Sequence, residues 1–339
     1  MKTGLTTTYD HYIAVDWSIS IMAIARMTSK SNQIKVVEVP SDLTDLKAYL
    51  ANLQGTKILT LEESMGSHWL YVELKDHVDR IVICDPYRNR LLSEGPKTDK
   101  MDASKLVQLL KANLLKEVFH SNDKFLDLRH LVSAYDDLIK AGVRLKNQRY
   151  SLLRNCGLSG KEKMGHQLPK ASDQLVLSSI ERQIRSYEED KKVYEDEFSR
   201  LGKAHPEVKH QDTLPGIGPI GAIKMIAQVV TPERFSDVGH FLSYCGLIKL
   251  EKKSGMMSYG RKSSRYCRTL KAIYKTAALA TIGGNNEFND YYESLIKKGV
   301  ADYNARHKVA RRLATLSLGI FKSGKKYQRR TYVKEVQEV

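Results

Sequence analysis

The chain has 339 residues, 42% of them hydrophobic and 28% charged, so it is long enough for two or three globular domains. No run approaches the roughly 18 apolar residues of a membrane-spanning helix, and the N-terminus has no apolar signal core, so neither a membrane protein nor a secreted one is expected. The net charge of +16, from 55 Lys and Arg against 39 Asp and Glu, indicates a polyanionic partner, most often nucleic acid.

Residues 9–120 are expected to form an α/β domain. Short apolar or alternating runs predict strands at 12–18, 22–29, 34–40, 57–63 and 80–86. Amphipathic runs predict helices at 41–54, at 67–76 and from about 99 to 115. Three strands followed by alternating helices and strands are typical of a mixed sheet covered by helices.

Residues 121–205 are expected to form a helical hairpin or coiled coil that links two domains, with a turn at 155–165. In the first helix a leucine recurs every seven residues, at Leu131, Leu138, Leu145 and Leu152. In the second, the a/d rhythm is followed by Leu177, Ile180, Ile184, Tyr187, Tyr194, Phe198 and Leu201. Two ordinary core-packed helices explain the same periodicity, because the heptads are few.

Residues 206–327 are expected to form a helical domain, with helices at 266–282, 287–298 and 303–322, followed by a polar tail at 328–339. The positive charge is concentrated here. Residues 249–272 carry eight Lys and Arg against one acid, and residues 301–330 carry nine against one. The four cysteines of the chain form no CxxC pair, which suits a reducing compartment and argues against a zinc ribbon.

Four carboxylates are candidates for one acidic site, although each of them taken singly also has an ordinary explanation. Asp16 lies inside the first apolar strand, where a charge is costly without a partner. Glu63 ends another strand, and its neighbour Glu62 is the rival, because strand alternation lets only one of the two face a given site. Asp99 and Asp102 open a later helix on one face, although Asp99 could equally serve as the helix cap.

Carboxylates of this number and hardness suit Mg²⁺ or Mn²⁺. Two such ions can activate a nucleophile and stabilise the leaving oxygen in phosphoryl transfer. The order strand Asp, strand Glu, helix Asp pair therefore favours a ribonuclease-H-like nuclease fold.

The glycine-spaced turn LPGIGPIGA (214–222) and the basic run at 252–271 suit contacts to nucleic-acid phosphates. A plain tight turn explains the glycines equally well. The candidate nucleic-acid contacts, including two lysines beside the Asp99 turn, are Lys97, Lys100, Gly216, Gly218, Lys252, Lys253, Arg261, Lys262, Arg265, Arg268 and Lys271.

The basic run also holds the serines Ser254, Ser258, Ser263 and Ser264. Most serines in basic loops only make hydrogen bonds, and with no histidine nearby in the sequence a catalytic triad is not supported. A metal ion or the acidic site could activate such a serine instead.

In this order, the segments IAVDWS, EESMGSHW, KTDKMDA, LPGIGPIGA, KKSGMMSYGRKSSRYCRTL and HKVARRLA resemble the DEDD transposases of the insertion sequence 110 family, over about residues 10–327. The resemblance implies a RuvC-like domain whose metal-binding tetrad is Asp16, Glu63, Asp99 and Asp102, and a second domain with a helix-hairpin-helix-like motif and a catalytic serine. The Glu-x-x-Gly turn selects Glu63, and the Ser-Gly position falls on Ser254. Met65 and His68 depart from the usual Thr and Tyr, and because MMSYG follows Ser254 where the family commonly has more Gly and Arg, Ser258 is the second choice.

The resemblance further implies a bacterial or archaeal cytoplasmic protein that acts at the nucleoid on target and donor DNA. A structured bridge RNA would pair with both DNAs, and two to four protomers would assemble so that one protomer's tetrad meets another's serine. Alternatives are a DNA invertase, a junction-resolving nuclease in which only the acids act on water, and a nucleic-acid-binding scaffold with no reaction.

Overall fold

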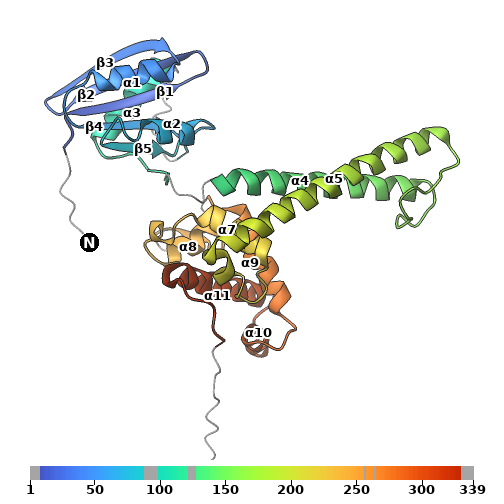
Figure 1. The fold of residues 1–339 in the computed structure, drawn as a ribbon. Helices are drawn as coiled ribbons and strands as arrows, with labels where there is room; N and C mark the ends of the chain where they lie inside the picture. Colours follow the sequence, from blue (N-terminus) through green and yellow to red (C-terminus); the bar gives the residue numbers. More distant parts are fainter. Residues whose placement is uncertain (1–7, 88–97, 121–126, 256, 263–264, 330–339) are drawn as a thin grey trace, which may run out of the picture. The chain divides into compact units, whose positions relative to one another are not determined.

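The computed structural model describes residues 8–87, 98–120, 127–255, 257–262 and 265–329 (Figure 1). At residues 127, 250, 252–254 and 261–262 only the backbone is described. The chain divides into two compact units, residues 1–122 and 123–339, each with its own hydrophobic core. Within the described ranges, no helix is both long enough and apolar enough to cross a membrane.

The first unit is built on one five-stranded mixed sheet. Its strands are β1 (His11–Trp17), β2 (Ile21–Thr28), β3 (Ser31–Pro40), β4 (Lys57–Glu62) and β5 (Arg80–Cys84). The spatial order is β3-β2-β1-β4-β5, with β1, β2 and β3 antiparallel and β4 and β5 parallel to β1. All five predicted strands are confirmed, with ends that move by up to three residues.

Helices cover both faces of this sheet. The side chains of β1 alternate: Ile13 and Val15 point to the face covered by α1 (Leu43–Ala51) and α2 (Ser67–Leu74). Tyr12 and Ala14 point to the opposite face, which is covered by α3 (Asp99–Lys111). The predicted helix at 99–115 thus ends four residues early, and Asn113 takes a positive φ just beyond it.

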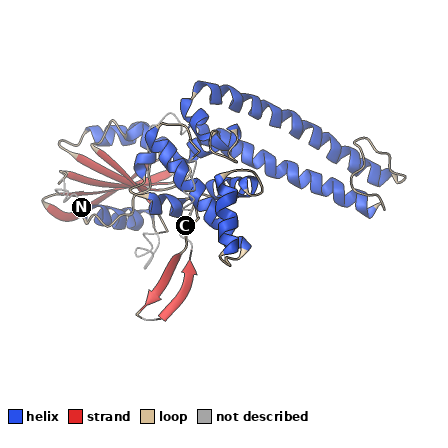
Figure 2. Ribbon diagram, turned by 90° about the horizontal axis from the view of Figure 1, so that it is seen from below, coloured by secondary structure: helices blue, strands red, loops and turns tan. Residues whose placement is uncertain are grey.

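The second unit begins with two long helices that lie side by side, α4 (Asp127–Asn155) and α5 (Ala171–Ala204), as Figures 1 and 2 show. The connecting loop covers 156–170, longer than the predicted turn. At the base of the pair, Leu128, Tyr135 and Phe198 are buried in the core of the helical body. Lys224 of α7 (Pro219–Val229) forms an ion pair with Asp136 of α4, with 2.5 Å between nitrogen and oxygen. The base of the pair is therefore built into that body.

Burial along α4 departs from the predicted leucine repeat. Leu145 is buried, but Leu131, Leu138 and Leu152 are only half-buried. Val132 and Leu153, each one residue further on, are the fully buried ones. On α5 the expected positions Leu177, Ile180, Ile184, Tyr187 and Phe198 are buried.

The helical body follows α5. It consists of α6 (Pro206–Gln211), α7 (Pro219–Val229), the 3-10 turn η2 (Pro232–Arg234), α8 (Val238–Tyr244), α9 (Arg268–Thr281), α10 (Glu287–Lys297) and α11 (Asp302–Ser323). The three helices predicted after residue 266 are confirmed to within two residues.

An antiparallel hairpin of two strands, β6 (Leu250–Ser254) and β7 (Met257–Lys262), interrupts this helical body and stands out from it in Figure 2. The expectation of an all-helical domain is wrong at this point. The basic run folds as a ribbon because the tight turn at Gly255, with φ +59°, lets its two halves pair.

Candidate functional site

Asp16 lies near the carboxyl end of β1, on the sheet face that α3 covers. It follows Tyr12 and Ala14 at two-residue intervals, and both of these pack against α3. In the sheet register Asp16 pairs with Ala23 of β2, and Ala23 pairs with Glu38 of β3. These three residues form a row across the sheet.

The first turn of α3 lies above this row. Lys100 in that turn forms an ion pair with Glu38, with 2.6 Å between nitrogen and oxygen. At the other end, Lys111 Nζ donates to the carbonyl oxygens of Thr28 and Ser31 at 2.8 and 3.0 Å, near the start of β1. The helix therefore runs against β1 and carries Asp99 and Asp102 to the end of the strand where Asp16 lies.

The cap of α3 is Thr98, whose Oγ1 accepts a hydrogen bond from the Met101 N–H at 3.3 Å. The interpretation of Asp99 as the helix cap is therefore wrong. The side chains of Asp99 and Asp102 make no hydrogen bond and no ion pair with the residues that the structure describes. Two carboxylates in the first turn are favoured by the helix dipole, and both keep their oxygens available to a ligand.

Glu63 lies one residue past β4, which neighbours β1 and runs parallel to it. Its N–H donates to the Cys84 carbonyl at 3.0 Å, so it still pairs with β5. Alternation along β4 places Glu62 on the face of Ile58, which is also the face of Asp16. Glu63 is half-buried and Glu62 is exposed. The strand pattern therefore keeps Glu62 as the rival of Glu63.

A third parallel strand ends beside these residues with a carboxylate that the sequence reasoning did not single out. Asp85 follows β5, is 8% exposed, and its Oδ1 accepts from the Tyr87 N–H at 2.9 Å. The signal for it was the Asp-Pro pair that closes the apolar run RIVIC. The hydrogen bond closes an Asx turn, which accounts for a buried acid at this point.

These acids share one edge of the sheet, but they do not form a closed metal cage. No group of three His, Cys, Asp or Glu side chains within the described ranges is near enough to hold one ion. The donor set itself suits a hard divalent cation, because carboxylate oxygens are the ligands that Mg²⁺ and Mn²⁺ take in proteins. These acids thus suit a metal ion by their ligand chemistry and by their common location at one edge of the sheet.

Two aromatic rings lie at the same end of the sheet. Trp17 follows Asp16, and its ring meets that of Trp69 edge to face at 5.8 Å. Trp69 is 47% exposed, and Met65 in the preceding turn is fully exposed. Because Trp17 alternates with Asp16 along β1 and packs with the core under α1 and α2, these rings lie at the same end of the sheet but on the opposite face from Asp16.

The two candidate serines both lie on the β6–β7 hairpin in the second unit. Ser254 is the last residue of β6, at the tip, and pairs with Met257. Ser258 pairs with Lys253, and its hydroxyl donates to Glu251 Oε1 at 3.2 Å. The side chain of Ser254 lies outside the described part of the structure.

Several predicted nucleic-acid contacts can be placed. Lys100 is held by Glu38, Arg265 and Arg268 are exposed, and the Lys271 ammonium lies 4.2 Å from the centre of the Tyr266 ring. Gly216, at φ +79°, lies against the backbone of α9, and Gly218 caps α7 in open space. Outside the described part lie Lys97 and the side chains of Lys252, Lys253, Arg261 and Lys262.

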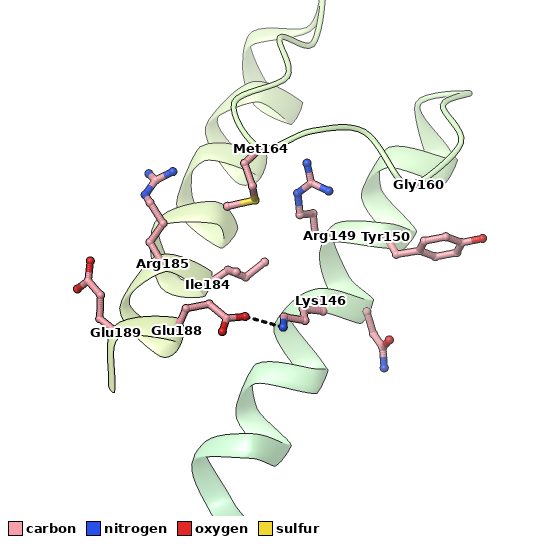
Figure 3. A pocket seen from close by; sticks show the side chains of 10 residues that line it. Lys146, Arg149, Tyr150, Gly160, Met164, Ile184, Arg185, Glu188 and Glu189 are labelled. Atoms are coloured by element: carbon pink, nitrogen blue, oxygen red, sulfur yellow. Dashed lines mark hydrogen bonds and ion pairs between the residues drawn. The ribbon is translucent and has the colours of Figure 1, made fainter. Parts of the chain in front are cut away.

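The pocket in Figure 3, of about 750 Å³, lies elsewhere, between α4, α5 and their connecting loop. The ion pair of Lys146 with Glu188, 2.6 Å long, stands on one side, and Arg149, Met164 and Arg185 also line the pocket. None of the predicted site residues lines it.

Comparison with known proteins identifies both units. Residues 13–157 match a family model described as Transposase, the DEDD model of the IS110 group, and residues 209–293 match one described as Transposase IS116/IS110/IS902 family. The two matches together cover about two thirds of the chain.

Two curated relatives align over parts of their length. One is the insertion element IS110 uncharacterized 43.6 kDa protein of Streptomyces coelicolor, 24% identical over 46% of this chain and 39% of that protein. The other is the transposase for insertion sequence element IS1111A of Coxiella burnetii, 22% identical over 66% of each chain. The aligned parts thus span less than two thirds of these relatives. Because the two family matches fall on the strand-end acids and on the serine hairpin, in chain order, the chain belongs to the IS110 family of DEDD transposases.

Proposed function

We propose that this chain is a transposase of an insertion sequence that cuts and rejoins DNA with a metal-binding tetrad and a serine nucleophile. One observation carries the proposal. The first turn of α3 brings Asp99 and Asp102, both without a partner among the described residues, to the strand end that carries Asp16. Strand order β3-β2-β1-β4-β5, with three antiparallel strands and then two parallel ones, supports a ribonuclease-H-like class for this unit.

Asp16, Glu63, Asp99 and Asp102 would hold Mg²⁺ or Mn²⁺. When bound, such an ion supplies positive charge that stabilises the oxygens of a transferring phosphoryl group. The carboxylates themselves fix the position of the reaction at the sheet edge, and Lys100 is kept beside them by its ion pair with Glu38. The exposed Trp69 ring offers an apolar surface at the same edge.

Ser254 would attack the phosphorus of a DNA phosphodiester. The bond from serine Oγ to phosphorus forms, one bridging P–O bond breaks, and the serine proton ends on the departing hydroxyl. The number of phosphate ester bonds is unchanged, so the reverse attack by a DNA hydroxyl can rejoin strands with no outside energy source. A hairpin that stands out from its helical body suits this role, because its tip can enter a site formed by another surface.

The proposed division of labour follows the chain. Residues 9–120 would be the catalytic domain, 121–205 a helical hairpin that connects it to 206–327, and 206–327 the serine domain with a helix-hairpin-helix-like α6–α7 turn, before a tail at 328–339. Target and donor DNA are the proposed substrates, with a structured guide RNA as partner. A dimer or tetramer would join one protomer's acids with another's serine, which is compatible with the location of acids and serine in separate compact units.

The test is a covalent adduct assay with labelled DNA carrying the ends of the element, in Mg²⁺, on a denaturing gel. Ser254→Ala is expected to abolish the protein–DNA adduct, and Ser258→Ala, the matched control, to keep it. Asp102→Asn is expected to lower cleavage by more than the roughly 10–100-fold that loss of an outer-shell partner costs. Glu63→Gln should do the same and Glu62→Gln should not.

Three alternatives give different results with these variants. Hydrolysed ends with full activity of Ser254→Ala would identify a nuclease that uses water, as in a junction resolvase. An adduct that persists in Ser254→Ala but not in Ser258→Ala would move the nucleophile. Unchanged recombination by the Asp102→Asn variant would favour the alternative of a nucleic-acid-binding scaffold.

A further inference from the structure

A second candidate site lies on the helical body, where α9 and α11 pack side by side (Figure 1). Lys271 and Lys275 are one turn apart on α9. Tyr303, His307 and Arg311 follow each other at four-residue intervals on α11, so they form one stripe. We call the two stripes, together with Tyr266, the α9–α11 cationic face.

The cations and rings of this face interleave. The Lys271 ammonium lies 4.2 Å from the centre of the Tyr266 ring, and the Lys275 ammonium lies 5.3 Å from that of Tyr303. The rings of Tyr303 and His307 are parallel to within 3°, with centres 6.4 Å apart. Tyr303 is 66% exposed, so much of its surface is accessible.

His307 lies in a half-buried, positively charged environment. Its Nε2 donates to the carbonyl of Leu247 at 2.8 Å, which leaves Nδ1 as a buried nitrogen with no hydrogen-bond partner in the described structure. The pKa of His307 is lowered by burial first, while the bond to Leu247 acts in the opposite direction. The positive charges of Arg311, Lys275 and Lys271 lower the pKa of His307 further.

The positive charge is not neutralised within the protein. Lys271, Lys275 and Arg311 form no ion pair with any carboxylate in the described residues. The nearest acid along α11, Asp302, is bonded to Arg306 and Tyr292 instead. Like charges at i and i+4 repel each other, so a face of this kind gains most from an anionic ligand.

We propose that the α9–α11 cationic face binds a single-stranded segment of nucleic acid, with backbone phosphates on Lys271, Lys275 and Arg311 and an unpaired base stacked on Tyr303. The proposal rests on the function proposed above and names one surface for its substrate. Interleaved rings favour nucleic acid over an acidic protein, because every base presents a flat face to a ring. They favour a single strand over a duplex, because bases inside a duplex are already stacked.

The test measures the dissociation constant of the full chain by fluorescence anisotropy at several salt concentrations. The probes are a single-stranded oligodeoxynucleotide, the RNA of the same sequence and the corresponding DNA duplex. K271Q/K275Q is expected to weaken single-strand binding and to make the log–log salt slope shallower by about 1.4, because each lost phosphate contact contributes about 0.7. The matched control, K297Q/K298Q on the exposed end of α10, removes the same charge elsewhere.

A second set of variants in the same binding assay tests the Tyr303 ring. Tyr303→Ala should weaken single-strand binding about tenfold, with the salt slope and duplex binding nearly unchanged, whereas Tyr303→Phe should bind like the wild type. A thermal melt of each variant checks folding. A preference for the DNA or the RNA strand identifies which of the two this face serves, and either supports the proposal.

Two outcomes separate the failures. If the wild type binds nucleic acid and K271Q/K275Q has the slope of the K297Q/K298Q control, the inference is wrong and the proposed function stands. The same conclusion follows if K271Q/K275Q alters only self-association. If the wild type binds none of the three probes, the proposed function and this inference fail together.

Discussion

Gly216 and Gly218 differ sharply in their surroundings, although only one residue separates them. At Gly216, φ is +79°, and a Cβ built there would lie 2.6 Å from the carbonyl oxygen of Ala277 on α9. At Gly218, φ is −96°, and a Cβ would meet nothing within 4 Å. A positive φ and the close approach of two backbones therefore account for Gly216, whereas Gly218 has open space where a side chain would lie.

We expect Gly216→Ala to lower the free energy of unfolding by about 2–3 kcal/mol, because a left-handed φ and an overpacked contact add up. Gly218→Ala should cost less than about 1 kcal/mol, since Ala is only a poorer helix cap than Gly. Urea denaturation followed by circular dichroism measures both. A stable Gly216→Ala variant that has lost DNA binding would show instead that this glycine serves a phosphate.

For single residues, the sequence leaves two neighbouring candidates for the cap of α3 and two for the acid at the end of β4. Thr98 and Asp99 are both good capping residues, and the extended backbone of Thr98, with φ −139°, decides between them. Glu62 and Glu63 differ by one step of strand alternation, and β4 ends between them. Neither choice could be read from composition, because it depends on where one element ends.

The tip of the α4–α5 pair is held by a buried ion pair (Figure 3 labels Arg149). Arg149 Nε and Glu181 Oε1 are 2.9 Å apart, and the two side chains are 10% and 4% exposed. Arg149 also donates to the carbonyl oxygens of Glu162 and Lys163, both at 2.8 Å. Glu181 accepts from the Gly165 N–H at 2.7 Å. The pair therefore fixes the shape of the connecting loop.

We expect Arg149→Met alone to destabilise the protein by about 3–5 kcal/mol, because it leaves the Glu181 charge buried without its partner. The double variant Arg149→Met with Glu181→Leu should recover most of that stability, but not the loop. Trypsin should then cut it faster than the wild type at Lys161 and Lys163, since the carbonyls on this segment have lost their donor.

The control for the Arg149–Glu181 ion pair is Lys146→Met. Its partner is Glu188, in an exposed ion pair of 2.6 Å, so its loss should cost between 0 and about 1 kcal/mol. Loop cleavage should stay at the wild-type rate. If the double variant resists trypsin as the wild type does, packing alone holds the loop, and the Arg149–Glu181 ion pair does not fix its shape.

Elements were predictable where a periodic apolar pattern existed. The five strands and the long helices follow such patterns, and most core positions of α5 were found in advance. The β6–β7 hairpin has no such pattern, because LEKKS and MSYGRK are mostly polar, and those of its side chains that the structure describes are exposed. Local turn geometry at Gly255 makes it a ribbon, and polarity suggested only a loop.

At the scale of the whole molecule, the sites depend on which elements become neighbours. The order of acids along the chain indicated a tetrad, but only the sheet register and the ends of α3 place Asp102 near Asp16. The α9–α11 cationic face escaped notice for the same reason. Each stripe is visible in the sequence, yet the two stripes are about 30 residues apart and their adjacency is a product of packing.

Unfolding of the two units can be followed by different spectroscopic signals. The chain has two tryptophans, Trp17 and Trp69, and both lie in the unit of residues 1–122, beside the strand-end acids. The long helices all lie in the other unit. Tryptophan fluorescence therefore follows unfolding of the first unit, and far-ultraviolet circular dichroism follows mainly the second.

If the strand-end acids hold a divalent ion, Mg²⁺ or Mn²⁺ stabilises the first unit by mass action. At ten times the Kd the gain is about 1.4 kcal/mol, which raises the Tm of a unit of 122 residues by roughly 5 °C. We expect this shift in the melt followed by tryptophan fluorescence, with the circular dichroism melt nearly unchanged. Asp102→Asn should remove the shift.

Asp45→Asn is the matched control, because Asp45 is exposed on α1, on the opposite face of the sheet from α3. It removes one carboxylate from the same unit and should leave the metal-induced shift intact. An equal shift in both melts would indicate that the ion acts on the whole chain. A shift that survives in Asp102→Asn but disappears in Asp45→Asn would place the ion on the α1 face and contradict the proposed tetrad.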